Sequence, residues 1–396
     1  MTAEEIKTLD KKYYLNTYGD RLPVAFETGK GIELYSTEGE TYYDFLGGIA
    51  VNALGHHNEK LTKAIKAQVD KLLHTSNLYY IENQALLAKE LCEHSCADKA
   101  FFCSTGAEAN EGAIKLAKKY FYNKGEDRYE IISLDKSFHG RTLATVAATG
   151  QEKYQKPYRP LVPGFIQVEA NNFEAMKNAV TEKTAAIMIE LIQGESGVYP
   201  MDAEYVKQLR KLCDEKGIIL IFDEVQTGMG RTGEYFAHQY YGIEPDIFTC
   251  AKALGGGVPI GGVGAKDFVA SAFTPGDHGT TFGGNPLATA AGLAVFKIFK
   301  EDNILDNVKQ MSKYFVERLE DLKEKYPNKI VEIRSAGLLI GIELEESISK
   351  NVFTALFENK YLTSLCKNTI RIAPPLIINK NDIDGFVNVM ERILKQ

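Results

Sequence analysis

A lysine stands directly after an apolar run in the second half of the chain. Residues 247–251 have the sequence IFTCA, which is typical of a buried strand, and Lys252 follows them at the start of a glycine-rich turn. Asp223 ends a second very apolar run, residues 218–222, in the same way. Because a buried charge needs a partner, a lysine and a carboxylate at the inner ends of two core strands indicate a reactive site.

A third segment, residues 103–111 with the sequence CSTGAEANE, has the features of a phosphate-binding turn. It leaves a strand, turns on small residues and opens a long helix, so that free backbone N–H groups and the helix dipole face a ligand. Thr105 and Glu108 could instead form a capping box. Both interpretations can hold, because the cap uses side chains, whereas a phosphate would use the N–H groups of Gly106 and Ala107.

These three groups together fit one cofactor, pyridoxal phosphate. Its aldehyde requires an amine, its ring nitrogen requires a carboxylate partner, and its phosphate requires an anion site. Lys252, Asp223 and the turn at Gly106 supply these groups in that order. The sequence therefore predicts that the chain binds pyridoxal phosphate.

Other motifs carry less weight. Residues 228–233, GMGRTG, match the GxGxxG pattern of dinucleotide-binding proteins, but residues 223–227 separate them from the preceding strand, and Asp246 stands before the next strand instead of after it. No GxxxxGK[ST] motif is present, which excludes a P-loop. Cys92 and Cys96 flank His94, yet no CxxC pair or second cluster completes a zinc site, so we predict a helix end there and no metal.

The reactive residues belong to a pattern of strands that alternate with helices. The strand candidates are residues 100–104, 130–134, 185–190, 218–223 and 247–251. Between these strands, apolar residues recur at helical spacing most clearly over residues 106–123 and over residues 203–217, the second of which ends at a glycine. This alternation predicts an α/β fold whose largely parallel sheet is covered by helices on both faces. Every predicted strand ends in polar or ionisable residues, and ligands bind at that edge of open α/β sheets.

Length, charge and cysteine content limit the remaining possibilities. We expect an N-terminal segment over residues 1–54 that contains a hairpin and joins the small domain, a large domain over 55–300 and a smaller α+β domain over 301–396. The net charge of −7 argues against a nucleic-acid or anionic-membrane partner. The start of the chain lacks signal-peptide features, no apolar run is long enough to span a membrane, and six scattered cysteines suit a reducing compartment. We therefore expect a cytoplasmic protein.

Six stretches make the chain resemble the class III aminotransferases, pyridoxal-phosphate enzymes of fold type I. They are STGAEANE, SFHGRT, QGESGV, IFDEVQTGMGRTG, PDIFTCAKALGGG and TTFGGNPLA, and the likeness covers essentially the whole chain. The chain departs from the family pattern at Ser104-Thr105, usually Asn-Ser, and at Leu191, usually Pro. The resemblance implies a large domain with a mostly parallel sheet, a smaller α+β domain, and a homodimer with active sites at the subunit interface.

The resemblance also implies how the cofactor is held. Lys252 is implied to bind the cofactor's aldehyde covalently and later to move the proton, and Asp223 to pair with the ring nitrogen. The other implied contacts are Gly106 and Ala107 at the phosphate, Phe138 on the ring face, Gln226 near the phenolic oxygen, and Thr281 reaching over from the partner subunit. For His139 we expect a structural or ring-edge role, because Lys252 already supplies the acid–base function.

Arginines carry the substrate specificity that the resemblance implies. GGIAVNALGHH and AKALGGGVPIGG are most similar to the acetylornithine aminotransferases of the class, which transfer the δ-amino group of N2-acetyl-L-ornithine to 2-oxoglutarate. Arg141 is implied to bind the α-carboxylate of acetylornithine and the distal carboxylate of glutamate, and Arg371 the α-carboxylate of glutamate. Glu195 is implied to neutralise Arg371 while acetylornithine is bound, and Thr280 is a further expected substrate contact. Arginine suits these roles because its planar fork binds carboxylates bidentately.

Several related activities remain open at this stage. Succinylornithine, ornithine, succinyldiaminopimelate or 4-aminobutyrate could replace acetylornithine, because the acyl pocket comes from loops and from the partner subunit. The same residues could also support an aminomutase. A non-catalytic binding module is disfavoured, because Lys252 and Asp223 are both intact.

Overall fold

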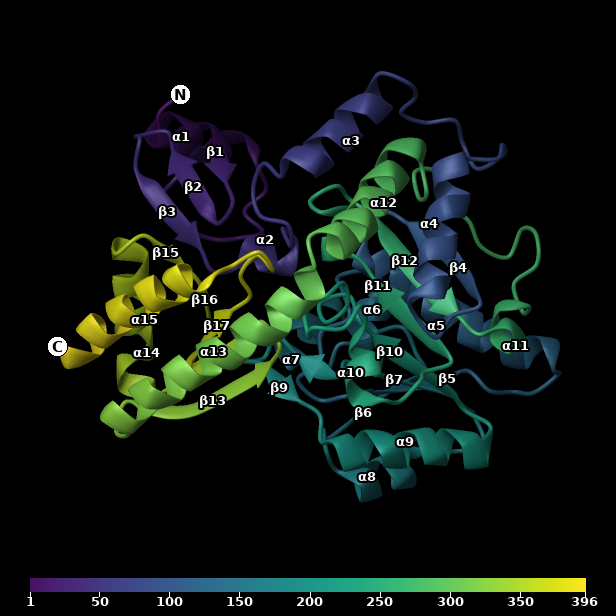
Figure 1. The fold of residues 1–396 in the computed structure, drawn as a ribbon. Coiled ribbons are helices and arrows are strands. Elements are labelled where there is room, and N and C mark those ends of the chain that lie inside the picture. Colours follow the sequence, from purple (N-terminus) through teal and green to yellow (C-terminus); the bar gives the residue numbers. More distant parts are fainter.

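The computed structural model describes residues 1–396, and its largest element is a seven-stranded sheet (Figure 1). In spatial order its strands are β4 (Lys99–Cys103), β12 (Gly261–Ala265), β11 (Ile247–Cys250), β10 (Ile219–Asp223), β7 (Thr184–Ile189), β5 (Glu130–Leu134) and β6 (Phe165–Val168). Strands β11, β10, β7, β5 and β6 are parallel to one another. The predicted α/β class is confirmed, and the five predicted strands lie within one residue of their expected limits.

Strand β12 is the exception to the parallel arrangement, since it runs antiparallel to both β11 and β4. Its sequence, GGVGA, contains three glycines and a single branched residue, so it lacks the composition that marks a strand. The glycines are needed for packing. A Cβ on Gly264 would lie 2.3 Å from the ring of Phe248, and a Cβ on Gly261 would lie 2.3 Å from the carbonyl oxygen of Thr105.

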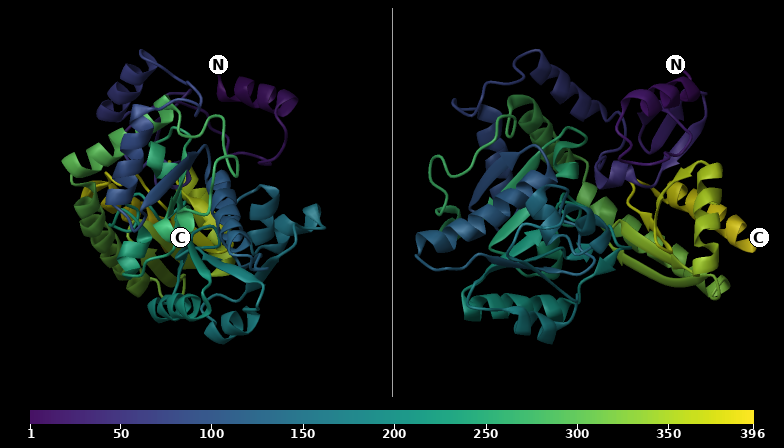
Figure 2. Two further views of the ribbon diagram at one scale, coloured as in Figure 1. Left: turned by 90° about the vertical axis from the view of Figure 1, so that its right-hand side faces the viewer. Right: turned by 180° about the vertical axis from the view of Figure 1, so that it is seen from behind.

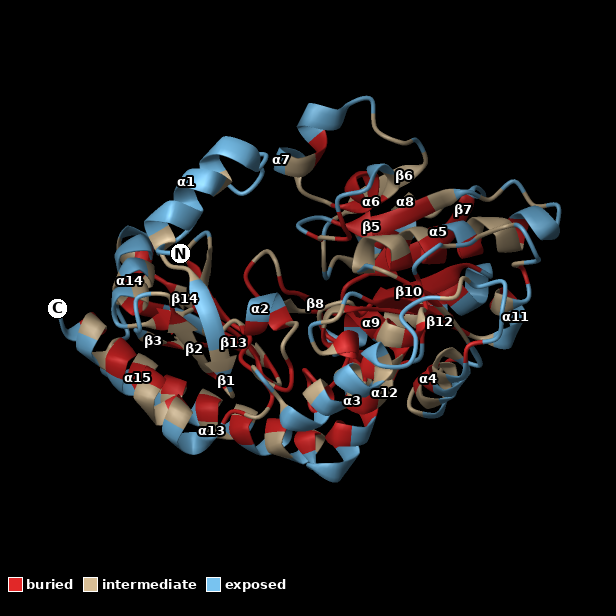
Figure 3. Ribbon diagram, turned by 90° about the horizontal axis from the view of Figure 1, so that it is seen from above, coloured by how far each residue is buried: buried red, intermediate tan, exposed pale blue.

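Helices cover both faces of the large sheet, as predicted, and each face has its own core (Figures 2 and 3). Leu220 and Phe222 of β10 belong to the core that includes α8 (Phe173–Ala179), α9 (Ala203–Lys216) and α12 (Pro286–Glu301). Ile219 and Ile221 belong to the opposite core, with α5 (Gly106–Asn123) and α11 (Asp267–Ala270). Because successive side chains of a strand point to opposite faces of the sheet, the residues of β10 contribute alternately to the two hydrophobic cores.

Two smaller sheets lie beside the large one. The first contains β1 (Phe26–Lys30), β2 (Glu33–Ser36), β3 (Thr41–Asp44) and β15 (Tyr361–Leu362). The second contains β13 (Ile330–Ala336), β14 (Leu339–Leu344), β17 (Thr369–Ile372) and β16 (Ser364–Cys366). Because β15 pairs with β3, segments near the two ends of the chain share one sheet. The predicted hairpin is β2–β3, whereas the domain limits stay a prediction.

The remaining helices surround these sheets. α13 (Ile304–Lys325) and α14 (Glu346–Glu358) pack on the C-terminal sheet, and α15 (Lys380–Lys395) packs against both of these helices. α1 (Ala3–Tyr13) has no buried residue (Figure 3). The other elements are α2 (Gly47–Ala50), α3 (Glu59–Val69), α4 (Glu82–Glu93), α6 (Leu143–Ala148), α7 (Glu152–Gln155), η1 (Lys156–Tyr158), α10 (Ala237–Tyr241), η2 (Lys252–Gly255), and the strand pair β8 (Ile192–Gln193) and β9 (Tyr199–Pro200). None of the helices combines the length and the apolar composition that a membrane span requires.

The GMGRTG segment packs between the large sheet and the C-terminal elements. A Cβ on Gly230 would lie 2.6 Å from the Phe299 ring, and Arg231, which is fully buried, donates to the carbonyl oxygens of Leu338 and Pro374. Gly230 therefore allows close packing against α12, and the arginine connects the loop after β10 to the turn between β13 and β14 and to the segment that follows β17.

Candidate active site

The carboxyl ends of β7 and β10 place two carboxyl groups on the same face of the sheet. Ile221 faces α5, and the alternation along β10 turns Asp223 to that side as well. Met188 of β7 faces the same core, so Glu190, which follows the strand, also emerges there. Both side chains are buried. The predicted edge of the sheet therefore carries a pair of buried acids.

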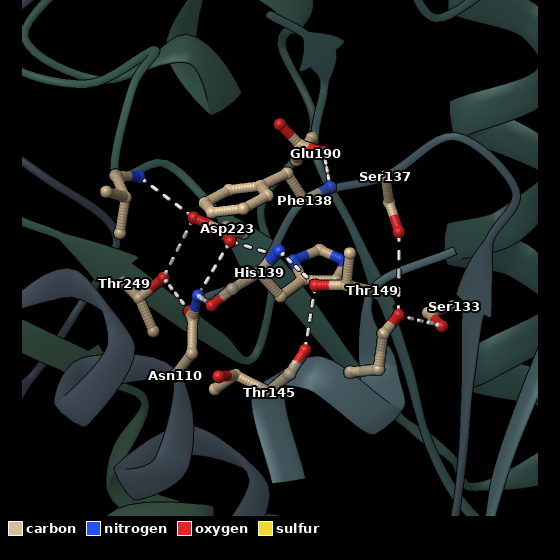
Figure 4. Close-up of polar contacts among 12 residues, drawn as sticks. Asn110, Ser133, Ser137, Phe138, His139, Thr145, Thr149, Glu190, Asp223 and Thr249 are labelled. Carbon is tan, nitrogen blue, oxygen red and sulfur yellow. Dashed lines mark hydrogen bonds and ion pairs between the residues drawn. The ribbon is translucent and has the colours of Figure 1, made fainter. Parts of the chain in front are cut away.

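Asp223 is held by hydrogen bonds from three segments of the chain, a helix and two loops (Figure 4). Its Oδ2 accepts from Asn110 Nδ2 of α5 at 2.8 Å and from His139 Nδ1 at 2.8 Å, and its Oδ1 accepts from the backbone N–H of Val225 at 3.0 Å. Thr249 of β11 in turn donates to Asn110 Oδ1 at 2.7 Å. This network fixes the orientation of the carboxylate and satisfies its charge, as a partner for a ring nitrogen requires.

His139 and Glu190 complete the polar surroundings of Asp223. Burial alone would lower the pKa of His139, but its hydrogen bond to Asp223 and the charges of Asp223 and Glu190 raise that pKa above its ordinary value. Burial raises the pKa of Glu190 to about 8, with the charge of Asp223 acting in the same direction. Glu190 also accepts the backbone N–H of Phe138 at 2.8 Å. Burial therefore favours the protonated, uncharged form of Glu190 near neutral pH.

Lys252 lies at the first position of η2, in a strained backbone conformation. Its φ is +47°, in the left-handed region that non-glycine residues rarely adopt. Burial lowers the pKa of its amine to about 8, and the positive charge of Arg371 acts in the same direction. The amine is therefore partly neutral near physiological pH. A neutral amine is the nucleophilic form of lysine.

A cavity of about 500 Å³ connects these groups. The predicted site residues that line it are Gly106, Ala107, Phe138, Arg141, Asp223, Gln226 and Lys252. Its size lies within the range of small-molecule sites. The structure thus brings together seven of the residues that the sequence singled out, from segments far apart in the chain.

The lining of the cavity fits pyridoxal phosphate on three observations. Thr105 accepts from the N–H of Glu108 as the helix cap, and Gly106 and Ala107 follow at helix positions whose N–H groups have no partner within the helix. A Cβ on Gly106 would lie 2.7 Å from Val225, so a side chain there would close the turn. Gln226 Oε1 and His139 Nε2 are buried atoms without a hydrogen-bond partner inside the protein. A polar ring could satisfy both.

Arg371 lies in β17 beside a carboxylate. Its Nη1 is 3.5 Å from Glu195 Oε2 and donates to the Gly194 carbonyl oxygen at 3.2 Å, while its Nε donates to Ser364 Oγ at 3.0 Å. The guanidinium is buried, so Glu195 is its neutralising partner. The predicted pairing of these two residues is present in the structure.

Arg141 has a different environment. Its guanidinium carbon lies 3.7 Å from the centre of the Tyr154 ring, on α7, and 5.3 Å from that of Phe138. It forms no hydrogen bond or ion pair, and its side chain is exposed beside the cavity. The guanidinium lies over aromatic rings and has no hydrogen-bond partner in the chain, so its N–H groups are available to a carboxylate.

The loop that carries Glu195 is anchored by a third arginine. Arg334 of β13 donates through Nε to the Val198 carbonyl oxygen at 3.1 Å and through Nη2 to that of Gly197 at 3.1 Å. Both acceptor residues have positive φ, +58° for Val198 and +128° for Gly197. The loop is therefore held in a strained form by a side chain of the C-terminal sheet.

Four predicted residues are absent from the lining of this cavity: Arg371 and Glu195, which pair with each other, and two threonines. Thr280 and Thr281 belong to the segment between α11 and α12, and neither lines the cavity that contains Lys252 of the same chain. The segment is held by Asn77, whose Nδ2 donates to the carbonyl oxygens of Thr280 at 3.1 Å and Gly283 at 3.0 Å. Within one chain, these threonines therefore do not contribute to the cavity.

Sequence reasoning missed two residues of the site. Asn110 is a buried amide on the inner face of α5, and a polar residue in an otherwise small and apolar helix face was a usable signal. Tyr154 gave no such signal, because Glu152, Lys153 and Lys156 around it are charged and exposed.

Comparisons with known proteins agree with the geometry of the site. The family model described as "Aminotransferase class-III" matches residues 14–394. The acetylornithine aminotransferase of Methanocaldococcus jannaschii is 52% identical over 398 residues, which cover 100% of this chain and 99% of that protein.

Two crystal structures extend the comparison to the fold. The ornithine aminotransferase of Toxoplasma gondii gives a TM-score of 0.95 at 29% identity, covering 100% of this chain and 95% of that one. The acetylornithine aminotransferase of Elizabethkingia anophelis gives 0.88 at 31% identity, covering 100% and 99%. These matches, together with a buried lysine and a fixed aspartate at the rim of one cavity, place the chain in the class III aminotransferase family of pyridoxal-phosphate enzymes of fold type I.

Proposed function

We propose that the protein is an acetylornithine aminotransferase. It transfers the δ-amino group of N2-acetyl-L-ornithine to 2-oxoglutarate, giving N-acetyl-L-glutamate 5-semialdehyde and L-glutamate, and runs in the reverse direction in arginine biosynthesis. The observation that carries the proposal is the pairing of Arg371 with Glu195 near Lys252, together with an Arg141 that has no ionic partner. The 52% identity to the relative from M. jannaschii supports the same substrate.

The arrangement of charges suits two substrates of different length. Arg141 is free to bind the α-carboxylate of acetylornithine or the distal carboxylate of glutamate. Arg371 is neutralised by Glu195 when only one carboxylate needs a partner, and is released when glutamate brings a second. One site can therefore accept a δ-amino group in one half-reaction and an α-amino group in the other.

The residues of the cavity then have the following roles. Bound pyridoxal phosphate supplies an aldehyde that captures amines and a ring that withdraws electrons from the reacting carbon. The carboxylate of Asp223, held in place by His139 and Asn110, would keep a proton on the ring nitrogen. Lys252 Nζ, which is partly neutral near pH 8, takes the proton from the substrate carbon that bears the amino group and returns it later.

The remaining predicted contacts position the cofactor. The N–H groups of Gly106 and Ala107 would hold the phosphate, Phe138 would cover the ring, and Gln226 would bind the phenolic oxygen. Thr281 serves a second subunit in a homodimer, and Thr280 beside it contacts substrate there. Three observations support the dimer: Thr281 lies outside the cavity of its own chain, Asn77 holds its segment, and the neighbouring Tyr80 and Phe282 are exposed apolar side chains. The proposal places this enzyme in the cytoplasm, where its six free cysteines would stay reduced.

Ornithine is the second candidate donor, because the fold is so similar to the ornithine aminotransferase of T. gondii. The sequence identity to that enzyme is 29%, against 52% to the acetylornithine enzyme, so the acylated donor is favoured.

A donor panel tests the proposal. The holoenzyme is mixed in single turnovers with acetylornithine, succinylornithine, ornithine, succinyldiaminopimelate and 4-aminobutyrate, and loss of the cofactor's visible absorbance is followed. Acetylornithine should give the largest kcat/KM, with glutamate formed from 2-oxoglutarate. A larger kcat/KM for unacylated ornithine would overturn the assignment of acetylornithine as the donor. If no donor bleached the cofactor, the proposed aminotransferase activity itself would be refuted.

A further inference from the structure

We propose that Tyr154 is a positioning residue that lets the site alternate between its two carboxylate-binding modes. The proposal deepens the proposed function and rests on it. Tyr154 lies on α7 and contacts both Arg141 and Glu195, the neutralising partner of Arg371. Its hydroxyl donates to Glu195 Oε1 at 3.1 Å, and its ring lies 3.7 Å below the guanidinium of Arg141.

The ring of Tyr154 orients Arg141. That guanidinium has no carboxylate, carbonyl or hydroxyl partner, so its orientation depends on the aromatic faces of Tyr154 and Phe138. The two rings meet edge to face, with centroids 5.8 Å apart, and so form one support. A guanidinium that packs over an aromatic ring keeps its N–H groups available for bidentate binding and loses less freedom when a carboxylate arrives.

The hydroxyl of Tyr154 has a separate role at Glu195. The two oxygens of Glu195 have different partners, since Oε2 pairs with Arg371 and Oε1 accepts from Tyr154. When the α-carboxylate of glutamate binds Arg371, Glu195 must give up that pairing. The tyrosine hydroxyl remains as its partner, so the partly buried carboxylate keeps a hydrogen-bond donor from the protein.

Loss of the hydroxyl should therefore affect only one binding mode. Without it, Glu195 has no partner other than Arg371 and competes with the second carboxylate of glutamate. The mode that uses Arg141 alone requires no movement of Glu195 and is unaffected. Loss of the whole ring should weaken both modes, because both use Arg141.

Two non-reacting probes separate these modes by calorimetry on the holoenzyme. Glutarate carries the two carboxylates of glutamate, and N-acetyl-L-norvaline is acetylornithine without its δ-amino group. Tyr154→Phe should raise the Kd of glutarate about tenfold, the effect of losing a hydrogen bond to a charged group, and leave that of N-acetyl-L-norvaline within about twofold. Tyr154→Leu should raise both. Tyr158→Phe, at an exposed tyrosine of the adjoining η1, is the matched control and should change neither.

Single-turnover bleaching gives a second readout. In Tyr154→Phe the glutamate half-reaction should slow about tenfold at low substrate concentration, through KM instead of kcat, while the acetylornithine half-reaction is retained. An unchanged Kd for glutarate, or an equal loss for both probes, would overturn the role of Tyr154. Failure of the wild-type enzyme to react with acetylornithine would instead refute the proposed substrate, and the glutarate result would still decide whether Tyr154 controls access to Arg371.

Discussion

At Lys252, burial and a neighbouring positive charge act together on one amine. They lower its pKa from 10.5 to about 8. An amine attacks an aldehyde in its neutral form, which predominates above the pKa. Capture of pyridoxal phosphate by the apoenzyme should therefore accelerate as the pH rises from 6 and level off above about 9. Stopped-flow absorbance of cofactor uptake measures this profile.

The positive charge of Arg371 provides a control for the pH profile of cofactor uptake. Arg371 lowers the pKa of Lys252, so Arg371→Gln should move the midpoint of the uptake profile to higher pH. A wild-type rate that still rises beyond pH 10, as for an exposed lysine, would show that the amine is not perturbed in the folded protein. A downward movement in Arg371→Gln would show that the guanidinium does not act on it.

Among the elements, the loop between β8 and β9 depends on β13. Arg334 donates to two carbonyl oxygens of this loop and pairs with Glu343 of β14. Arg334→Leu should leave these acceptors without their donor and cost about 1–3 kcal/mol of unfolding free energy. Because the same loop carries Glu195, the ratio of kcat/KM for glutamate to that for acetylornithine should also change.

Urea unfolding measures the change in unfolding free energy, and kinetic assays of the two half-reactions measure the change in the kcat/KM ratio. Arg318→Leu is a suitable control, since Arg318 pairs with Asp384 at the surface of α13 and its loss should cost less than about 1 kcal/mol. If Arg334→Leu is destabilised but keeps the wild-type ratio of kcat/KM for glutamate to kcat/KM for acetylornithine, the arginine stabilises the sheet without positioning Glu195.

For the whole molecule, the separation of Thr281 from the cavity of its own chain predicts shared active sites. Thr281→Val homodimers should bind pyridoxal phosphate about tenfold more weakly, because one hydrogen bond to a phosphate is lost. Lys252→Ala homodimers should be inactive. A heterodimer of the two variants contains one intact site, with Lys252 from one chain and Thr281 from the other.

Co-expression with two affinity tags yields that heterodimer. The heterodimer should show about half of the wild-type activity. Its single intact site should bind pyridoxal phosphate with wild-type affinity, and cofactor titration measures that affinity. If its single active site binds the cofactor as weakly as the Thr281→Val homodimer, the threonine acts within its own chain. A monomer that is fully active in sedimentation experiments would exclude the shared site.

Local patterns in the sequence predicted much of the fold and of the cofactor site. Residues 106–123 and 203–216 form helices as their spacing indicates, and Gly217 ends the second with a φ of +61°. Strand β12 was not predicted, because its glycines are selected by contacts with Phe248 and Thr105, which are distant in the sequence. Patterns with a period of two or 3.6 report which face of an element is buried, but not what packs against it.

The sequence by itself determined that Lys252, Asp223 and the Gly106 turn end or follow core strands. Their residue types and positions relative to those strands are local properties. Only the tertiary structure decided that Asn110 and His139 hold Asp223, and that Tyr154 contacts both Glu195 and Arg141. The physical reason is that hydrogen bonds and ion pairs act over a few ångströms. Which groups come that close depends on how three sheets and their helices pack, and no single segment contains that information.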